Sequence, residues 1–155
     1  DADVRAFGVE SDGACSRFTV TRPGKEQRLN VTLNLPGLHN VLNALASIAV
    51  AQELELDDEA VVRALAEFQG IDRRMQIIAD QKTSCGQILF IDDYAHHPTE
   101  IAATLEAVRE GWAGRRLVVL FQPHRYSRTH DLLDDFATVL SSVDPLFLSE
   151  VYAAG

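Results

Sequence analysis

Sulfur-containing residues and basic residues are both scarce in this 155-residue chain, which has two cysteines and one methionine. Cys15 and Cys85 are too few for a disulfide framework or a four-ligand zinc site, so we expect two inert thiols. Lysine and arginine together number 14 against 23 acidic residues, and the net charge is −9. This balance argues against nucleic acid as a partner, because phosphate backbones are held by clustered Lys and Arg.

The chain also lacks long apolar runs and a signal pattern. No run approaches the ~20 apolar residues of a membrane span, and residues 1–5 show no basic-then-apolar start. We therefore expect a globular, cytoplasmic protein with no membrane partner, and the sequence predicts no particular oligomeric state. Asp1 is not Met, and Gly155 directly follows an apolar run, so both ends are expected to be cut.

A phosphate-binding loop is the third absence. Lys25 lies in Pro-Gly-Lys-Glu and Lys82 in Asp-Gln-Lys-Thr, and neither segment has the glycine-rich frame of such a loop. No G-x-G-x-x-G motif occurs either. We therefore expect no phosphate cradle within this chain.

The front of the chain has the pattern of strands followed by helices. β-Branched and apolar residues alternate or cluster at 4–10, 17–21 and 28–35. These stretches predict an antiparallel ribbon with a turn at Pro23-Gly24. From Leu38 the apolar period changes to 3.6 residues, which predicts a helix, and a second helix is capped by Asp57 and ends at Gly70.

The rear of the chain alternates strands and helices. Short apolar strands are predicted at Gln87–Ile91, Leu117–Phe121 and Leu146–Leu148. Helices beginning at Pro98 and at about Asp131 separate them, and this βαβαβ order predicts a Rossmann-like parallel sheet. The predicted fold class is α/β, with two parts, 1–70 and 71–155, that meet near residues 71–76.

Polar segments follow all three rear strands, at 92–100, 122–129 and 149–152. The carboxyl ends of parallel strands meet at one edge of a sheet, so these segments predict a binding site there. Arg125 and Arg128 are three residues apart, and in a helical turn both would offer donors to one carboxylate or phosphate. The alternative is a pair of exposed arginines that balances the acidic residues of the next helix.

Adjacent histidines and aspartates in the first of these segments suggest a metal-dependent phosphohydrolase as one alternative. Asp92, Asp93, His96 and His97 would have to converge on one ion, although adjacent residues of a strand or loop usually face opposite ways. We therefore predict no metal site built by this chain alone. His97 is better placed to cap the helix that begins at Pro98, and an aspartate at the strand end can accept hydrogen bonds from a ribose.

Two further groups of polar residues lie at element boundaries. His39, Asn40 and Asn43 stand at the start of the first helix, where amides can meet a planar heterocycle, or where His39 or Asn40 caps the helix. The pair Arg73-Arg74 lies where the two parts of the chain meet. It is either surface charge or a phosphate contact between them.

Five segments in this order resemble the Mur ligase family of bacterial cell-wall synthesis: 36–44, 70–76, 92–101, 121–129 and 150–155. The resemblance implies a cytoplasmic, ATP- and magnesium-dependent ligase that activates a muramate carboxylate as an acyl phosphate. It assigns 1–70 to the rear of the central ATP-binding domain and 71–155 to the front of the C-terminal domain. The segment 121–129 favours the family member that joins L-alanine to UDP-N-acetylmuramate over the murein-tripeptide recycling ligase.

The resemblance also implies a role for individual residues. His39, Asn40 and Asn43 match the segment that contacts adenine and ribose, with Asp92 or Asp93 on the ribose. Arg73 or Arg74 matches an arginine that reaches the γ-phosphate, and these arginines and His96 are the catalytic candidates. The amino-acid end of the site takes the remaining matches, which are Tyr94, His96, His124, Arg125 and Arg128.

The phosphate loop, the magnesium ligands and the UDP-sugar domain of the family have no counterpart in these residues. We therefore expect this chain not to complete the reaction by itself. The alternative of a different class is a nucleotide- or anion-binding module with no catalytic activity.

Overall fold

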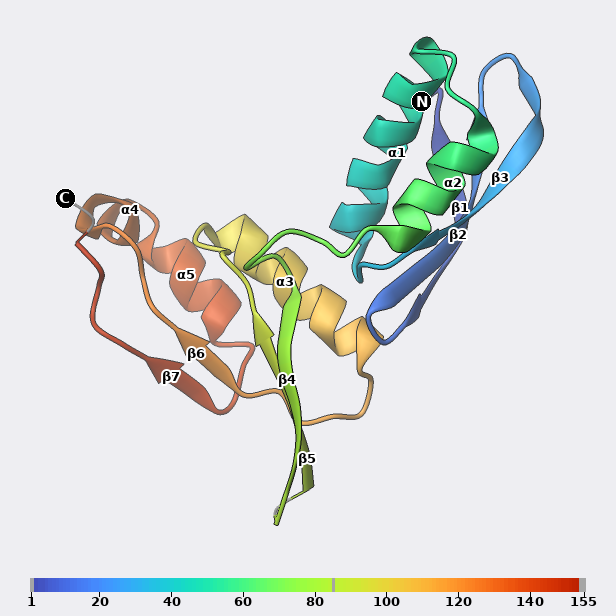
Figure 1. Cartoon of the computed structure of the whole chain (residues 1–155). Helices are drawn as coiled ribbons and strands as arrows, with labels where there is room; N and C mark the ends of the chain where they lie inside the picture. The colour runs from blue at the N-terminus through green and yellow to red at the C-terminus, as the bar shows by residue number, and fades with distance from the viewer. Residues whose placement is uncertain (1, 85, 154–155) are drawn as a thin grey trace.

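The computed structural model describes residues 2–84 and 86–153 and shows two parts joined near residue 71 (Figure 1). The elements of the front part are β1 (Arg5–Asp12), β2 (Cys15–Arg22), β3 (Lys25–Leu33), α1 (Leu38–Glu53) and α2 (Asp58–Glu67). Those of the rear part are β4 (Gln76–Thr83), β5 (Gly86–Asp92), α3 (Pro98–Gly111), β6 (Val119–Phe121), α4 (Tyr126–Asp131), α5 (Leu133–Leu140) and β7 (Leu146–Leu148). The α/β fold class predicted from the sequence is confirmed.

The front part is a three-stranded antiparallel sheet packed against two helices, as predicted. Alternate side chains of β2 and β3 point toward α1, since successive residues of a strand face opposite sides. The core that results consists of Phe18, Val20, Leu29, Val31, Leu33, Val41, Ala44 and Ile48. Asp57 caps α2 by accepting a hydrogen bond from the Ala60 amide at 2.9 Å.

A buried ion pair ties this sheet to α2. Arg22, at the end of β2, donates two hydrogen bonds to the carboxylate of Asp58 at 2.6 and 2.7 Å. Only 2% of the Arg22 side chain is exposed, against 34% for Asp58. The hydrogen bonds from Arg22 are the main reason that the pKa of Asp58 lies below its ordinary value.

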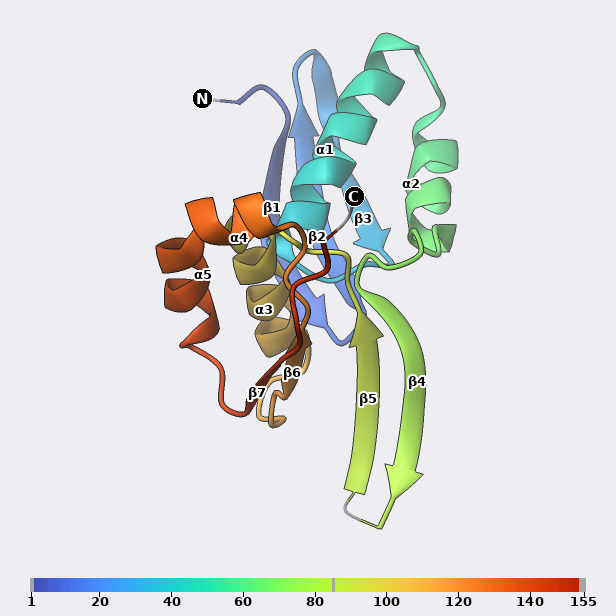
Figure 2. The same cartoon turned by 90° about the vertical axis from the view of Figure 1, so that its left-hand side faces the viewer.

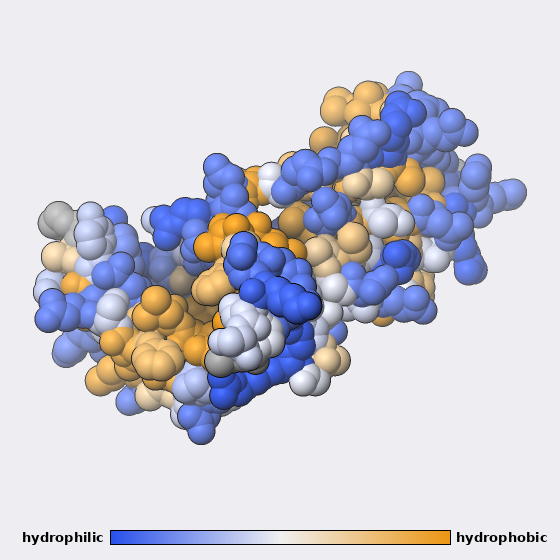
Figure 3. Space-filling model, turned by 60° about the horizontal axis from the view of Figure 1, so that its bottom comes forward, coloured by the Kyte–Doolittle hydropathy of each residue, from blue (hydrophilic) through white to orange (hydrophobic). Residues whose placement is uncertain are grey.

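In the rear part, β6 and β7 form the predicted parallel pair, and α3 and α5 pack on one face of it. The core between these layers consists of Ile101, Leu105, Phe121, Phe136, Leu140 and Val143. Among the described residues no helix covers the other face, and apolar side chains gather on the underside of the rear part (Figure 3). Exposed apolar residues of the rear strands include Leu120 in β6 and Phe147 and Leu148 in β7, together with Ile78 in β4 and Phe90 in β5.

One strand of the rear part was not predicted. β4 pairs with β5 in an antiparallel hairpin that extends away from the rest of the molecule (Figure 2). In the part of the chain that the structure describes, β5 has no other hydrogen-bonded strand, so the parallel sheet has two paired strands rather than three. Residues Asp80–Thr83 are polar, so β4 lacks the apolar pattern that predicts a strand. Asp80 nevertheless stabilises the hairpin, because its carboxylate accepts hydrogen bonds from the Gln87 side chain at 2.9 Å.

Another difference concerns the helix predicted from about Asp131. The chain turns helical earlier, at Tyr126, and Leu132 separates two short helices, α4 and α5. The described residues contain no helix that is both long and apolar enough to cross a membrane.

The two parts meet along α3. The amide of Gly13 donates to the carbonyl of Gly111 at 3.1 Å. One turn earlier in α3, Ala107 faces Gly37, which has a φ of +92°, and a Cβ added to Gly37 would lie 2.6 Å from the Cβ of Ala107. The start of α1 therefore approaches α3 so closely that only glycine fits.

Replacing Gly37 by alanine is expected to lower the free energy of unfolding by about 2 kcal/mol, because it adds both backbone strain and overpacking. Gly24→Ala is the matched control, since Gly24 also has a positive φ but no atom within 4 Å of an added Cβ. Urea unfolding measures both variants. Equal losses would show that the contact with Ala107 does not constrain this position.

Candidate functional site

A cavity of about 890 Å³ opens between the two parts of the chain. Its walls come from the end of β3, the starts of α1 and α3, the face of α2, and residues 71–75. Apolar residues such as Leu65 and Phe68 form much of the surface. Its polar residues are His39, Asn40, Asn43, Ser47, Arg74, Asp93, Thr99, Glu100 and Thr104. All three residues predicted at the start of the first helix therefore line one cavity, together with one member of each predicted Arg and Asp pair.

The residues at the start of α1 differ in what they contact. Asn40 donates its side-chain amide to the carbonyl of Pro36 at 2.8 Å, so part of its polar capacity holds the loop before the helix. The helix cap itself is Gly37, which makes no side-chain capping bond, so neither His39 nor Asn40 is the cap. Burial lowers the pKa of His39, the negative charge of Asp93 raises it, and the positive charge of Arg74 lowers it. His39, Asp93 and Arg74 thus act on one another electrostatically within the cavity.

Substitution of these two neighbours should move the pKa of His39 in opposite directions. Asp93→Asn removes a negative charge that favours the imidazolium, so the pKa should fall further; Arg74→Gln removes a positive charge, so it should rise. An NMR titration of the His39 ring measures both shifts. Asp80→Asn on the β4–β5 hairpin is the control. If Asp93→Asn and Arg74→Gln leave the pKa of His39 as unchanged as Asp80→Asn does, the three groups do not share the cavity.

The arginine and aspartate pairs divide between two environments. Arg73 forms an ion pair with Asp92 at 3.4 Å, and its guanidinium lies 4.8 Å from the centre of the Tyr94 ring. Arg74 lies 5.8 Å from the same ring and lines the cavity, as does Asp93. Arg74 and Asp93 are therefore the members of each pair that a ligand in the cavity can reach.

The carboxylate of Asp93 also connects three segments. It accepts hydrogen bonds from the Met75 amide at 2.8 Å, the Ala95 amide at 2.7 Å and the Thr104 hydroxyl at 3.3 Å. Met75 has a positive φ of 49°, which is uncommon for a residue other than glycine. Asp93 thus holds residues 73–75, including Arg74, against the end of β5 and α3.

A row of rings crosses the carboxyl ends of the rear strands. Tyr94 and His96 lie 5.0 Å apart between ring centres, His96 and His124 6.1 Å, and His124 and Tyr152 5.4 Å. These residues follow β5, β6 and β7, so the structure brings together the three polar segments that the sequence placed at one edge. Tyr152 also pairs by backbone with this edge, because its carbonyl accepts from the Arg125 amide at 2.8 Å.

Arg125 and Arg128 lie beside this row, at the start of α4. Arg125 is exposed and has a φ of +72°, while Arg128 is half-buried and donates to the His124 carbonyl at 3.5 Å. Desolvation lowers the pKa of His124, and the positive charges of Arg125, Arg128 and His96 lower it further. The two arginines therefore give the region around His96 and His124 a positive charge that can attract an anion.

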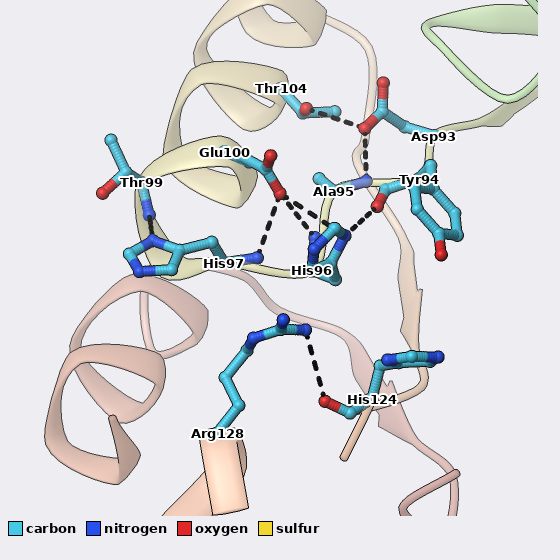
Figure 4. Close-up of polar contacts among 10 residues, drawn as sticks. All are labelled: Asp93, Tyr94, Ala95, His96, His97, Thr99, Glu100, Thr104, His124 and Arg128. Atoms are coloured by element: carbon cyan, nitrogen blue, oxygen red, sulfur yellow. Dashed lines mark hydrogen bonds and ion pairs between the residues drawn. The ribbon is translucent and has the colours of Figure 1, made fainter. Parts of the chain in front are cut away.

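The first turn of α3 holds the segment that carries His96. His97 caps the helix, as predicted, and Glu100 accepts hydrogen bonds from the His96 and His97 amides at 3.0 and 3.2 Å (Figure 4). Desolvation raises the pKa of Glu100, but these hydrogen bonds and the positive charges of His96 and Arg74 outweigh it, so the net shift is downward. Glu100 was not among the residues predicted for the site. A cap followed three residues later by Glu is the signal that identifies it.

The described residues hold no group of three or more His, Cys, Asp or Glu side chains placed to bind one metal ion. Asp92 faces Arg73, whereas Asp93 faces backbone amides and Thr104. The ligand set on which a metal-dependent phosphohydrolase would depend is therefore not assembled here.

Comparisons with known proteins find members of one family. The profile of the family described as Mur ligase, glutamate ligase domain, matches residues 73–153. UDP-N-acetylmuramate-alanine ligase from Thermotoga maritima is 36% identical with a TM-score of 0.83, over 98% of this chain and 33% of that one. MurF from Acinetobacter baumannii is 27% identical with a TM-score of 0.74, over 94% and 31%. A murein peptide ligase from Psychrobacter arcticus is 26% identical with a TM-score of 0.57, over 97% and 36%.

This chain spans about a third of the length of each of these relatives. The profile match covers more than half of its residues, and the similarity to the solved structures extends over both parts of the fold. The chain belongs to the Mur ligase family.

Proposed function

We propose that this chain carries one flank of the ATP site and most of the amino-acid site of a ligase that joins L-alanine to UDP-N-acetylmuramate. The observation that carries the proposal is the adjacency of two sites of different chemistry. A cavity with amide, carboxylate and guanidinium groups lies next to a cationic edge, and residues 92–100 contribute to both. An ATP-dependent ligase needs this adjacency, because the amino acid must reach a carboxylate that ATP has just activated.

The cavity suits a nucleotide in size and chemistry, since ligand pockets are typically ~300–1,000 Å³ with apolar walls and few polar groups. We assign the adenine to the apolar surface near Phe68, with the Asn43 amide as a hydrogen-bonding partner. We assign Asp93 to the ribose and Arg74 to the phosphates, since both line the same cavity. Arg73 supports Arg74 from outside the cavity by packing on the same Tyr94 ring.

The cationic edge suits the carboxylate of an amino acid. Arg125 and Arg128 offer forked donors beside His124 and Tyr94, and the edge is open enough for a small substrate. Glycine, alanine and serine differ little in this respect, so the identity of the amino acid depends on the similarity to the Thermotoga alanine ligase. The murein peptide ligase is a weaker match on both identity and TM-score.

In this proposal, residues 1–70 are the rear of the central ATP-binding domain and 71–155 the front of the C-terminal domain. The reaction runs through an acyl phosphate, and the chain's arginines would stabilise the negative charge that develops on the transferred phosphate. Magnesium would add to that stabilisation through ligands outside this chain. We expect the chain alone to bind substrates without completing the reaction. We also expect the protein to be located in the bacterial cytoplasm, where the family's soluble substrates are found.

NMR titration of the isotope-labelled chain tests the two-site assignment. ATP is expected to shift the signals of His39, Asn43 and Asp93, and L-alanine those of His96 and His124. Asn43→Ala should weaken ATP binding by about 10-fold, the cost of one or two lost hydrogen bonds. Asn30→Ala, which changes an exposed residue of β3, is the control. If both ligands shift the same residues, or if neither shifts any, the assignment is wrong.

A further inference from the structure

His96 has one ring nitrogen whose protonation the surrounding acceptors determine. Its Nδ1 lies 2.9 Å from the backbone carbonyl oxygen of Tyr94 and 3.6 Å from Oε2 of Glu100. A carbonyl oxygen can only accept a hydrogen bond, and an ionised carboxylate likewise, so Nδ1 must carry the proton. Neutral imidazole has one N–H, and the other nitrogen, Nε2, therefore presents a lone pair.

This lone pair is available to a ligand. Nε2 points away from Nδ1 across the ring, and among the described residues it has no hydrogen-bonding partner. The His96 side chain is 28% exposed. On the side of the ring away from Tyr94 and Glu100 lie the guanidinium of Arg128 and the ring of His124 (Figure 4). The acceptor Nε2 thus lies close to guanidinium groups that attract a carboxylate. Because an amino acid has its ammonium group one carbon from its carboxylate, a bound amino acid would bring that group near Nε2.

We propose that Glu100 and the Tyr94 carbonyl fix His96 as its Nδ1–H tautomer, so that Nε2 receives the ammonium group of the amino acid held by Arg125 and Arg128. This inference rests on the proposed function for the identity of the ligand, but not for the tautomer. Glu100 is a positioning residue in this arrangement, and His96 is the catalytic one.

The proton transfer that follows is balanced. One N–H bond of the ammonium group breaks, an Nε2–H bond forms, and the electron pair stays on the amine nitrogen, which becomes a nucleophile. His96 becomes an imidazolium with both nitrogens protonated. Arg125 and Arg128 repel the positive charge of this imidazolium. The carboxylate of Glu100, 3.6 Å from Nδ1, offsets that repulsion.

Glu100 acts on His96 through the backbone as well as through charge. Its two hydrogen bonds to the His96 and His97 amides fix the segment before α3, and with it the distance from Nδ1 to the Tyr94 carbonyl. Glutamine can make the same capping bonds, whereas alanine cannot. The pair Glu100→Ala and Glu100→Gln therefore separates the loss of position from the loss of charge.

Long-range proton–nitrogen NMR of the labelled chain, at a pH where His96 is neutral, tests the proposal. We expect a protonated Nδ1 and an unprotonated Nε2 in the wild type, although free histidine favours the opposite tautomer. Glu100→Ala should shift His96 toward the Nε2–H form, Glu100→Gln should restore the wild-type pattern, and Glu106→Ala on the exposed side of α3 should change nothing.

An Nε2–H tautomer in the wild type would overturn the proposal, and so would a Glu100→Ala spectrum identical to that of the wild type. The wild-type spectrum decides the tautomer even if a variant fails to fold. Addition of L-alanine should then shift Nε2 more than Nδ1. If the tautomer is as expected but L-alanine shifts neither nitrogen, the proposed amino-acid site fails and the tautomer assignment stands.

Discussion

Arg128→Gln is expected to reduce kcat/KM for L-alanine about 100-fold in a hybrid ligase, because a charge-assisted hydrogen bond to a carboxylate contributes roughly 2–3 kcal/mol. The hybrid would be the Thermotoga maritima alanine ligase in which this chain replaces the matching third. Arg125→Gln should have an effect of similar size, and the double variant should lose less than the product of the two. Phosphate release at increasing L-alanine concentration provides the measurement.

Two controls make this result specific. Arg116→Gln changes an exposed arginine before β6, at the opposite end of that strand, and should leave kcat/KM unchanged. Arg74→Gln should affect the dependence on ATP more than that on L-alanine. Unchanged kinetics for both Arg125→Gln and Arg128→Gln would mean that the pair only balances the acidic residues of α5.

Asp58→Asn is expected to lower the free energy of unfolding by about 3 kcal/mol, because it leaves the buried guanidinium of Arg22 without a counter-charge. Asp12→Asn, which breaks the exposed pair between Asp12 and Arg17, should cost less than about 1 kcal/mol. Urea unfolding compares the two. The lowered pKa of Asp58 adds a pH dependence: its stabilisation is present above the ordinary pKa of aspartate and is lost as pH falls through the lowered value.

A double replacement tests the cause of that loss. Arg22→Met with Asp58→Leu removes both charges and should recover most of the stability, since the cost comes from an unpaired buried charge. If Asp58→Asn costs no more than Asp12→Asn, the ion pair does not hold α2 to the sheet.

Local signals in the sequence predicted the helices of this fold better than the strand pairing. Asp57 and His97 cap α2 and α3 as expected, because a cap depends on residues within one turn. The hairpin partner β4 was missed because its second half is polar, so this segment lacks the apolar alternation that marks a strand. The break at Leu132 likewise has no proline or glycine to mark it.

The candidate site shows the same division. The sequence placed polar segments after three strands, and the structure brings those segments to one edge. The sequence did not indicate which of Asp92 and Asp93 faces the cavity, because β5 ends at Asp92 and Asp93 lies in the loop after it, where the alternation of a strand no longer applies. The role of Thr104 was also hidden, since its contact with Asp93 depends on how α3 packs against β5.

The most direct test of the account is phosphate release by the hybrid ligase with the wild-type sequence of this chain. We predict release that requires UDP-N-acetylmuramate, ATP and an amino acid together, with L-alanine the most effective amino acid. Equal rates with glycine, L-serine and L-alanine, or release that does not depend on the amino acid, would contradict the claim that this chain forms the alanine site.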